Sequence, residues 1–559
     1  MWAIVVKIAV LKEEVEVSNA ILNVPAPRNE PVYDYAPKSP ERSALQAATK
    51  DMLGKEIEIP IIVGGKEIRT GDLGEIRCPH DHGHVLAKYH RANTDIVHQA
   101  EKAAGEAWHE WSVMDWRARA SVVLRMAELL STKYRPIVNA ATMLGQSKTA
   151  HQAEIDAAAE LIDFYRFNAH YMQQIYAGQP VSSPGIWNYL EYRALEGFVL
   201  AITPFNFTAI GGNLSVSPAL MGNTVLWKPA STAVLSSYYL MELFKEAGLP
   251  DGVINFIPGS GGKVGAPAMA MPTLAGIHFT GSTEVFQLMW STVGENIKNY
   301  KVYPRIVGET GGKNFIFAHP SANVEALVAN TIRGAFEYQG QKCSAASRAY
   351  IPESLWNAFK ERLVAEVATI KTGDVTDFGN FMGAVIDKPA FDTITEYIDY
   401  AKDSSEAEFI TGGSYDGSKG YFIEPTTVLT TNPHFKLIEE EIFGPVITIY
   451  VYPDDKFEET LELCDKTSPY ALTGAIFADD RVAIEKAFRT LRHSAGNFYI
   501  NDKPTGAVVG QQPFGGSRAS GTNDKAGSAG NLTRWTSIRT VKETFVPAAD
   551  YRYPFLESE

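Results

Sequence analysis

The apolar positions of the chain first follow the period of a helix and then become shorter runs. Between about Asn93 and Ile175, apolar residues recur at three- and four-residue spacing, as in QAEIDAAAELIDFYRFNAHYM, which predicts amphipathic helices. Two runs typical of β-strands follow, NYLEYRAL and GFVLAITPF, with a break at Gly197. The segment from about Asn93 to Ile175 is therefore predicted to be helical and to be followed by two strands.

Strands and helices then alternate. TVLWK, VINFIPG and GIHFTGS predict strands, TAVLSSYYLMELFKEAGLP predicts a helix between the first two, and a further helix and strand lead to Glu309. After Lys313 the alternation resumes with FIFAH, a helix from Val324, the strand RAYIP and a helix over SLWNAFKERLVAEVATI. This pattern is typical of parallel sheets with helices on both faces, so we expect two α/β units. SIRTVKETFV, near the end, is expected to pair with another element or another subunit.

The composition is that of a folded protein without a nucleic-acid or membrane partner. Of 559 residues, 45% are apolar and 21% charged, enough for a large core. The net charge of −14 and the lack of a basic run argue against nucleic acid. No run reaches the roughly 18–20 apolar residues of a membrane-spanning helix. Residues 1–20, with Lys7 and three acids, fit neither a signal nor a transit peptide and predict a strand or short helix. We expect a cytoplasmic protein, or a mitochondrial matrix protein in a eukaryote.

Several signals favour a bound nucleotide only when they are taken together. VINFIP is followed by four glycines, Gly259, Gly261, Gly262 and Gly265. The first, second and fourth are spaced G-x-G-x-x-x-G, a departure from the dinucleotide pattern G-x-G-x-x-G. FTGSTEV (279–285) is a second strand-to-helix turn that could hold phosphate, and Lys228 ends a strand, where such sheets bind ligands. The alternatives are a plain glycine-rich loop and a surface lysine.

Cys343 is the candidate nucleophile among three cysteines that have no metal-ligand or disulfide spacing, and no metal site is expected. It lies in the polar run GQKCS, which predicts a thiol outside the core, with Lys342 or a helix end favouring the thiolate. The alternative is an inert small side chain. Cys78 and Cys464 lack such neighbours and are predicted to be structural.

Two further side chains end predicted strands. Glu309, in RIVGETGGKNF, is either a strand-end acid or a general base whose pKa is raised in a partly desolvated cleft. Asn206, in TPFNFTAIGGN, is either a turn residue or an amide donor to a developing oxyanion.

These residues resemble one family. VGETGGKN, GQKCSA, TPFNFT, LWKPA, FTGS and EEIFGPV occur in the order and at the spacing of the NAD(P)-dependent aldehyde dehydrogenases, over about residues 60 to 545. The run VVGQQPFGGSRASGTNDK is the most specific signal. It is similar to the members that oxidise L-glutamate γ-semialdehyde, in equilibrium with 1-pyrroline-5-carboxylate, to L-glutamate in the second step of proline degradation.

The resemblance implies an α/β fold with a Rossmann-like cofactor domain, an α/β catalytic domain and a β-flap for oligomerisation. The implied divisions are an N-terminal extension (1–60), an NAD-binding domain (61–310, with 183–200 in the flap), a catalytic domain (311–530), and a flap segment with the tail (531–559). A homodimer or higher homo-oligomer is implied, together with a small-molecule substrate and a separate proline dehydrogenase as a possible partner.

The resemblance also implies residue roles. Cys343 attacks the aldehyde, Asn206 and the Cys343 N–H hold the oxyanion, and Glu309 activates the water that hydrolyses a thioester. The residues implied to bind NAD are Thr203, Lys228, Gly281, Ser282, Thr283, Glu284, Val285, Glu441 and Phe443. Those implied to bind the substrate are Phe207, Ser344, Gly506, Ala507 and Phe514.

Three positions depart from common family patterns. Ala507 replaces a frequent serine, which predicts the same substrate with a weaker KM, since a neutral hydrogen bond contributes about 0.5–1.5 kcal/mol. Ser231 replaces the glutamate of many NAD-specific members, so charge repulsion does not exclude NADP. Phe286 stands near a frequent glycine, as is usual in this subfamily. The alternatives to oxidation of glutamate γ-semialdehyde are a dehydrogenase of another acidic semialdehyde such as succinate semialdehyde, a non-catalytic family member, and a cysteine hydrolase.

Overall fold

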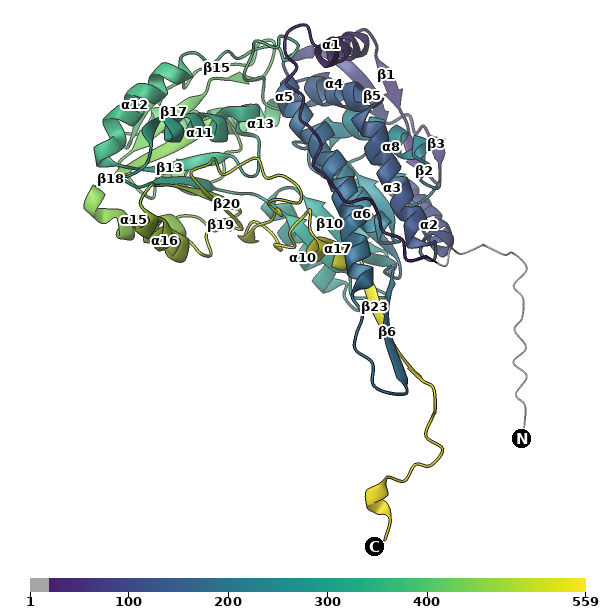
Figure 1. Cartoon of the computed structure of the whole chain (residues 1–559). Coiled ribbons are helices and arrows are strands. Elements are labelled where there is room, and N and C mark those ends of the chain that lie inside the picture. Colours follow the sequence, from purple (N-terminus) through teal and green to yellow (C-terminus); the bar gives the residue numbers. More distant parts are fainter. Residues whose placement is uncertain (1–19, 559) are drawn as a thin grey trace.

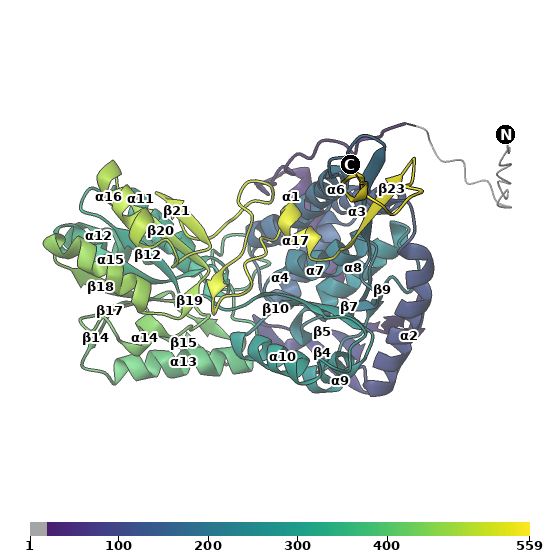
Figure 2. The same ribbon diagram turned by 90° about the horizontal axis from the view of Figure 1, so that it is seen from below.

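The computed structural model describes residues 20–558, so the element predicted for residues 1–20 falls almost wholly outside the described residues. Two seven-stranded sheets form two α/β units that lie side by side, and a two-stranded ribbon projects from the first unit (Figures 1 and 2). The two α/β units expected from the alternating pattern are therefore present.

The first sheet has the strand order β11-β10-β7-β8-β9-β2-β3. From β7 the chain adds β8 and β9 on one side and β10 and β11 on the other, all parallel, whereas β2 joins β9 antiparallel. The bounds are β2 (Ile61–Val63), β3 (Lys66–Ile68), β7 (Phe198–Ile202), β8 (Thr224–Lys228), β9 (Ile254–Phe256), β10 (Leu274–Thr280) and β11 (Arg305–Glu309).

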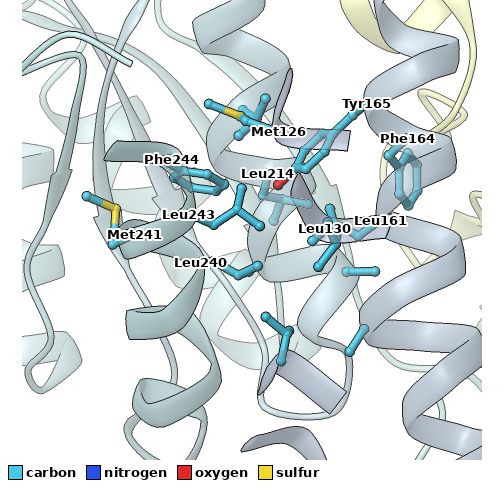
Figure 3. Close-up of a cluster of buried hydrophobic side chains, with 14 of the residues drawn as sticks. Met126, Leu130, Leu161, Phe164, Tyr165, Leu214, Leu240, Met241, Leu243 and Phe244 are labelled. Carbon is cyan, nitrogen blue, oxygen red and sulfur yellow. The ribbon is translucent and has the colours of Figure 1, made fainter. Parts of the chain in front are cut away.

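The central strands of this sheet are buried on both faces. Side chains alternate along a strand, so Val199 and Trp227 join a core on one face, while Leu200 and Leu226 join a core on the other. Figure 3 shows part of the first core, where α3, α6, α7 and α8 meet. The helices of this unit are α2 (Thr94–Trp111), α3 (Trp116–Ser131), α4 (Arg135–Gln146), α7 (Thr208–Leu220), α8 (Val234–Glu246), α9 (Ala266–Ala270) and α10 (Thr283–Glu295).

The helix predicted over QAEIDAAAELIDFYRFNAHYM is interrupted. The structure has α5 (Ala150–Ala153), then a π-helical turn η1 (Glu154–Glu160), then α6 (Leu161–Ala177). Such π turns are rare and frequently accompany functional sites.

The second sheet has the order β14-β17-β18-β13-β12-β20-β21, with only β14 antiparallel to its neighbour. Its strands are β12 (Asn314–Ala318), β13 (Ala346–Pro352), β14 (Ala407–Thr411), β17 (Thr426–Thr430), β18 (Val446–Tyr452), β20 (Thr473–Phe477) and β21 (Asn497–Ile500). Its helices are α11 (Val324–Phe336), α12 (Glu353–Val367), α13 (Lys388–Lys402), α14 (Lys436–Glu439), α15 (Phe457–Lys466) and α16 (Arg481–Thr490).

The remaining elements frame these units. The predicted terminal strand is β23 (Ser537–Thr544), which pairs antiparallel with β6 (Ile186–Arg193) along its whole length in the projecting ribbon. The others are α1 (Pro40–Leu53), β1 (Ile57–Ile59), β4 (Leu73–Cys78), β5 (Asp81–His90), β15 (Tyr415–Asp416), β16 (Phe422–Ile423), β19 (Tyr470–Ala471), β22 (Ser517–Arg518) and α17 (Ala529–Thr533). Across residues 20–558, no helix combines the length and apolar character needed to cross a bilayer.

Residues 20–39, the N-terminal strap, run in extended form beside α4 and α6, as the dark purple trace of Figure 1 shows. Buried ion pairs fasten the strap: Arg135 of α4 contacts Glu30 at 2.5 Å and also binds Glu154. Glu154 accepts further hydrogen bonds from the Tyr35 hydroxyl at 2.7 Å and from Asn139 at 2.8 Å.

Glu154→Ala is expected to lower the free energy of unfolding by about 3–5 kcal/mol, because it leaves the Arg135 guanidinium buried without one of its carboxylates. Lys133→Ala, which removes an exposed pair with Glu246, is the control and should cost less than about 1 kcal/mol. The shift of the urea midpoint measures both. Equal shifts would contradict the structural importance of the buried network.

Candidate active site

The predicted site residues gather at the carboxyl edge of the first sheet. The order of strands reverses between β7 and β10, and ligands of open α/β sheets bind at such a switch point. Asn206 follows β7, Lys228 ends β8, Gly281 follows β10 and Glu309 ends β11. The first unit therefore presents four of the predicted residues at one edge.

Cys343 lies in the second unit, in the turn between η4 (Glu337–Gly340) and β13. Asn314 of β12 fixes this turn, because its amide donates to the carbonyl oxygens of Cys343 at 2.7 Å and Ala345 at 2.9 Å. The second sheet thus places the thiol opposite the edge of the first.

The environment predicted for this thiol is wrong in two respects. Cys343 is only 9% exposed, because the polar side chains around it turn inward: Gln341 accepts from the Ile386 N–H, and Lys342 pairs with Glu337 at 3.1 Å. Burial raises the pKa of the Cys343 thiol, and nearby carboxylates, Glu309 foremost, raise it further. Lys342 is therefore paired with Glu337, and the surroundings of Cys343 favour the protonated thiol.

Glu309 is half-buried at the end of β11. Its carboxylate accepts from the Gly516 N–H at 3.3 Å, and burial raises its pKa well above the ordinary value. Lys525 opposes this effect by its charge; its ammonium group donates to the carbonyl oxygens of Gly496 at 2.8 Å and Gly515 at 2.9 Å. A carboxyl group whose pKa is raised by burial, beside a thiol, suits proton transfer.

Asn206 is buried, and its amide donates to the Gln341 carbonyl at 3.1 Å, two residues before Cys343. The next residue, Phe207, lies under the Lys148 ammonium at 4.1 Å from the ring centre. Lys148 in turn pairs with the buried Asp156 at 2.7 Å. The amide donor and this aromatic therefore sit where α7 meets the π-helical turn.

The residues expected to bind a dinucleotide range from buried to exposed. Thr203 accepts from the Trp227 indole at 3.0 Å, and burial lowers the pKa of Lys228 to about 8. Within residues 20–558 no carboxylate pairs with Lys228, whose ammonium donates to the Pro229 carbonyl at 3.2 Å. This buried cation fits a phosphate or a ribose hydroxyl.

The turn at 281–285 begins α10. Ser282 caps the helix by accepting from the Val285 N–H at 3.4 Å, and Ser282, Glu284 and Val285 are exposed, so the helix start is open to an anion. Thr283 donates to the Ala519 carbonyl at 3.3 Å. Phe286 is buried and stacks on Phe279 at 5.4 Å, so its departure from glycine fills the core.

Glu441 and Phe443 lie between the two units. Glu441 accepts from the Gly312 N–H at 2.7 Å, and burial raises its pKa to about 7. Phe443, with φ of 56°, meets the edge of Phe205 at 5.9 Å. Ser231, in contrast, is exposed at the start of η2 (Ser231–Ala233), and the glycine loop after β9 forms a π-helical turn, η3 (Gly261–Gly265).

The expected substrate residues are less closely connected. Ser344 is buried beside Cys343, where its carbonyl accepts from Thr473 at 3.3 Å. Phe514 is half-buried and bridges to Ala526. Gly506, with φ of 92°, and Ala507 lie on a partly exposed loop, and within residues 20–558 no side-chain hydrogen bond or ion pair joins either of them to Cys343.

Glu160 is a candidate that the sequence reasoning missed. It ends the π-helical turn half-buried, burial raises its pKa to about 8, and its charge acts on both Cys343 and Lys148. The sequence feature that could have indicated it is the segment EIDAAAE, an alanine-rich helical segment that contains three acids. Acids in such a segment are usually assigned to the solvent face, but here Glu154 and Asp156 are fully buried.

Comparison with known proteins identifies a matching family, related sequences and a similar solved structure. The Aldehyde dehydrogenase family profile matches residues 69–541. Delta-1-pyrroline-5-carboxylate dehydrogenase, mitochondrial, of Dictyostelium discoideum is 57% identical over 537 residues, covering 96% of each chain. The mitochondrial enzyme of the same name from Homo sapiens is 50% identical over 530 residues, covering 95% of this chain and 94% of the relative. The NAD-bound structure of delta-pyrroline-5-carboxylate dehydrogenase from Mycobacterium tuberculosis superposes with a TM-score of 0.94 at 51% identity, covering 97% of this chain and 100% of that one.

Proposed function

The chain belongs to the aldehyde dehydrogenase family, and we propose that it oxidises L-glutamate γ-semialdehyde to L-glutamate with NAD, the second step of proline degradation. The family and fold predicted from the sequence are confirmed. The observation that carries the proposal is the meeting of Cys343, Glu309 and Asn206 at the switch point of the first sheet. A nucleophile, a base and an amide donor are the groups that aldehyde oxidation through a thioester needs.

The proposed mechanism assigns one task to each side chain. The Cys343 sulfur, once deprotonated, adds to the aldehyde carbon, and the Asn206 amide together with the Cys343 N–H stabilises the oxyanion of the thiohemiacetal. NAD, when bound, supplies the hydride acceptor that converts this adduct into a thioester. Glu309 then takes a proton from water, which attacks the thioester carbon and releases glutamate and the thiol.

Cofactor binding is assigned to the carboxyl edge of the first sheet and to the segment between the units. Thr203, Lys228 and the turn at 281–285 are proposed to hold the phosphate and adenosine part, and Glu441 with Phe443 the part near the nicotinamide. Ser231 brings no negative charge to the position implied to lie at the adenosine ribose, so charge repulsion does not exclude NADP.

Substrate recognition is assigned to groups on both units. Phe207 and Phe514 would flank the aliphatic chain, while Ser344 and the N–H groups of Gly506 and Ala507 would bind the α-carboxylate. We assign the amine to Glu160, because a substrate ammonium would stabilise the carboxylate whose pKa burial raises.

NADH formation with 1-pyrroline-5-carboxylate, succinate semialdehyde and propanal tests this function. We expect a preference of tenfold or more in kcat/KM for the first, which is about 1.4 kcal/mol in transition-state binding. Equal or better turnover of succinate semialdehyde would overturn the substrate. No NADH from any aldehyde, with NAD still bound, would favour a non-catalytic family member.

Glu160→Gln is expected to lower kcat/KM for the semialdehyde by about 10- to 100-fold, because a hydrogen bond between charged groups contributes about 1.5–3 kcal/mol. Turnover of succinate semialdehyde, which has no amine, should stay within about threefold. Steady-state NADH formation with the two substrates measures the difference. Equal losses of kcat/KM with the two substrates would show that Glu160 acts in a step shared by both, and would overturn its assignment to the substrate amine.

Assembly and location are proposals as well. We propose a homodimer or higher homo-oligomer through the β6–β23 ribbon, which exposes Trp187 at 54% and Ile538 at 51%. A separate proline dehydrogenase would supply the substrate. Cytoplasmic location is proposed, or the mitochondrial matrix in a eukaryote, since the names of the Dictyostelium and human relatives include the word mitochondrial.

A further inference from the structure

The N-terminal strap reaches the loop that carries Gly506 and Ala507. The contact runs through one side chain, Asn29. Its amide nitrogen donates to the Val509 carbonyl at 2.8 Å and to the Asp163 carboxylate at 2.7 Å. Its amide oxygen accepts from the Gln511 side chain at 2.9 Å. A single amide therefore joins three segments that are remote in sequence.

The second of these segments is the helix that follows Glu160. Asp163 is buried on α6, three residues after Glu160, and its other carboxylate oxygen accepts from the Glu30 N–H at 2.7 Å. Residues three apart on a helix lie on neighbouring parts of one face. Asn29 is thus tied to the helical segment that places the Glu160 carboxylate.

The loop itself is compact on the side that Asn29 contacts. Val509 is buried, and the Val508 carbonyl accepts from the backbone N–H groups of Gln511 at 3.0 Å and Gln512 at 2.9 Å. Gly510, with φ of 82°, packs so close to Phe167 of α6 that a Cβ would come within 2.1 Å of the ring. The turn at 508–512 is therefore held between α6 and the strap, and it continues directly into Ala507.

The strap is itself firmly held at this point. Glu30, next to Asn29, binds Arg135 at 2.5 Å and Arg166 at 2.6 Å, and both its carboxylate oxygens are used. The Tyr33 ring also stacks on the Arg135 guanidinium at 3.6 Å. Asn29 consequently projects from a fixed backbone rather than from a loose end.

We propose that Asn29 is a positioning residue: it fixes the Gly506–Ala507 loop relative to Glu160 and so sets the spacing between the groups that bind the two charged ends of the amino-acid substrate. The inference rests on the proposed function, which assigns the α-carboxylate to that loop. Asn29 is not among the residues assigned to the substrate or to the cofactor. Losing it should weaken recognition of the amino-acid end without altering the thiol chemistry.

Asn29→Ala in the full-length enzyme is the test. We expect the KM for 1-pyrroline-5-carboxylate to rise fivefold or more, with kcat, the KM for NAD and the KM for propanal each within twofold of wild type. Propanal has neither a carboxylate nor an amine, so its KM reports general damage to the site.

Gln173→Ala is the matched control. Gln173 also lies on α6 and holds the strap, accepting from the Val24 N–H at 2.7 Å, but it contacts residues 23–24 and not the loop. It should leave all KM values within twofold. An unchanged KM for 1-pyrroline-5-carboxylate in Asn29→Ala, or an equal rise for propanal or in Gln173→Ala, would overturn the proposal.

If Asn29→Ala does not fold, Gln511→Ala replaces it, because that side chain is exposed and meets Asn29 from the loop side. A rise of twofold or more in the KM for 1-pyrroline-5-carboxylate alone would support the proposal, and no change would refute it. Failure of the proposed function is separate, since it would appear as a wild-type enzyme without preference for this substrate.

Discussion

Cys343→Ala is expected to lower NADH formation from every aldehyde by at least about 10⁴-fold, while NAD should bind within twofold of its wild-type affinity. The thiol is the sole proposed atom that bonds to the substrate carbon, and losing a nucleophile costs factors of this order or more. NAD affinity is retained because the residues assigned to its phosphates, such as Lys228, lie on the first unit, whereas Cys343 lies on the second. Steady-state absorbance at 340 nm and a titration with NAD measure the two effects.

Cys464→Ala is the control for this result. Cys464 is also a buried free cysteine, but it lies on the buried face of α15, and its carbonyl accepts from Arg348 at 3.1 Å. Its loss should leave turnover within about threefold, apart from some thermal destabilisation. Oxidation that survives in Cys343→Ala would show that another group forms the covalent bond.

Glu309→Gln is expected to slow hydrolysis of the thioester by about 10²- to 10⁴-fold, the usual contribution of a general base, and to leave hydride transfer much faster than hydrolysis. Mixing enzyme, NAD and substrate in a stopped-flow instrument should therefore give a burst of NADH close to one per active site, followed by a slow phase. An unchanged steady rate without a burst would remove Glu309 from the mechanism.

The pH dependence follows from the same carboxyl group. Water activation needs the carboxylate, and burial raises the pKa of Glu309 well above its ordinary value. The wild-type steady rate should therefore fall as the pH drops through that raised pKa, at a higher pH than for an exposed glutamate. This limb should disappear in the slow phase of Glu309→Gln, and a limb that persists would belong to another group.

The main architecture could be predicted from the sequence because its determinants are local. TVLWK and GFVLAI are continuous apolar runs, which parallel strands need when both faces are buried, and they became β8 and β7. Asn206, Lys228 and Glu309 could be singled out for a related reason: each is a polar residue at or just past the end of such a run.

What could not be predicted depends on partners distant in sequence. GQKCS contains enough polar residues to suggest an exposed thiol, yet the turn is buried, because the Gln341 side-chain oxygen accepts from the Ile386 N–H and Lys342 pairs with Glu337. The burial of the acids around Glu160 could not be predicted for the same reason. Asp156 is buried because it pairs with Lys148 and accepts from the N–H groups of Thr208 and Ala209. The strap has no hydrophobic period, and Asn29 meets Val509 across 480 positions.

The two strands of the β6–β23 ribbon are synthesised at widely separated times. Arg193 pairs with Ser537, 344 residues later. At a translation rate of about 5–20 residues per second, β6 leaves the ribosome roughly 20–70 seconds before its partner strand exists. During that interval β6 is an unpaired strand edge that carries an exposed Trp187, the type of segment that associates with other nascent chains. Ribosome stalling between the two strands would prolong this exposure.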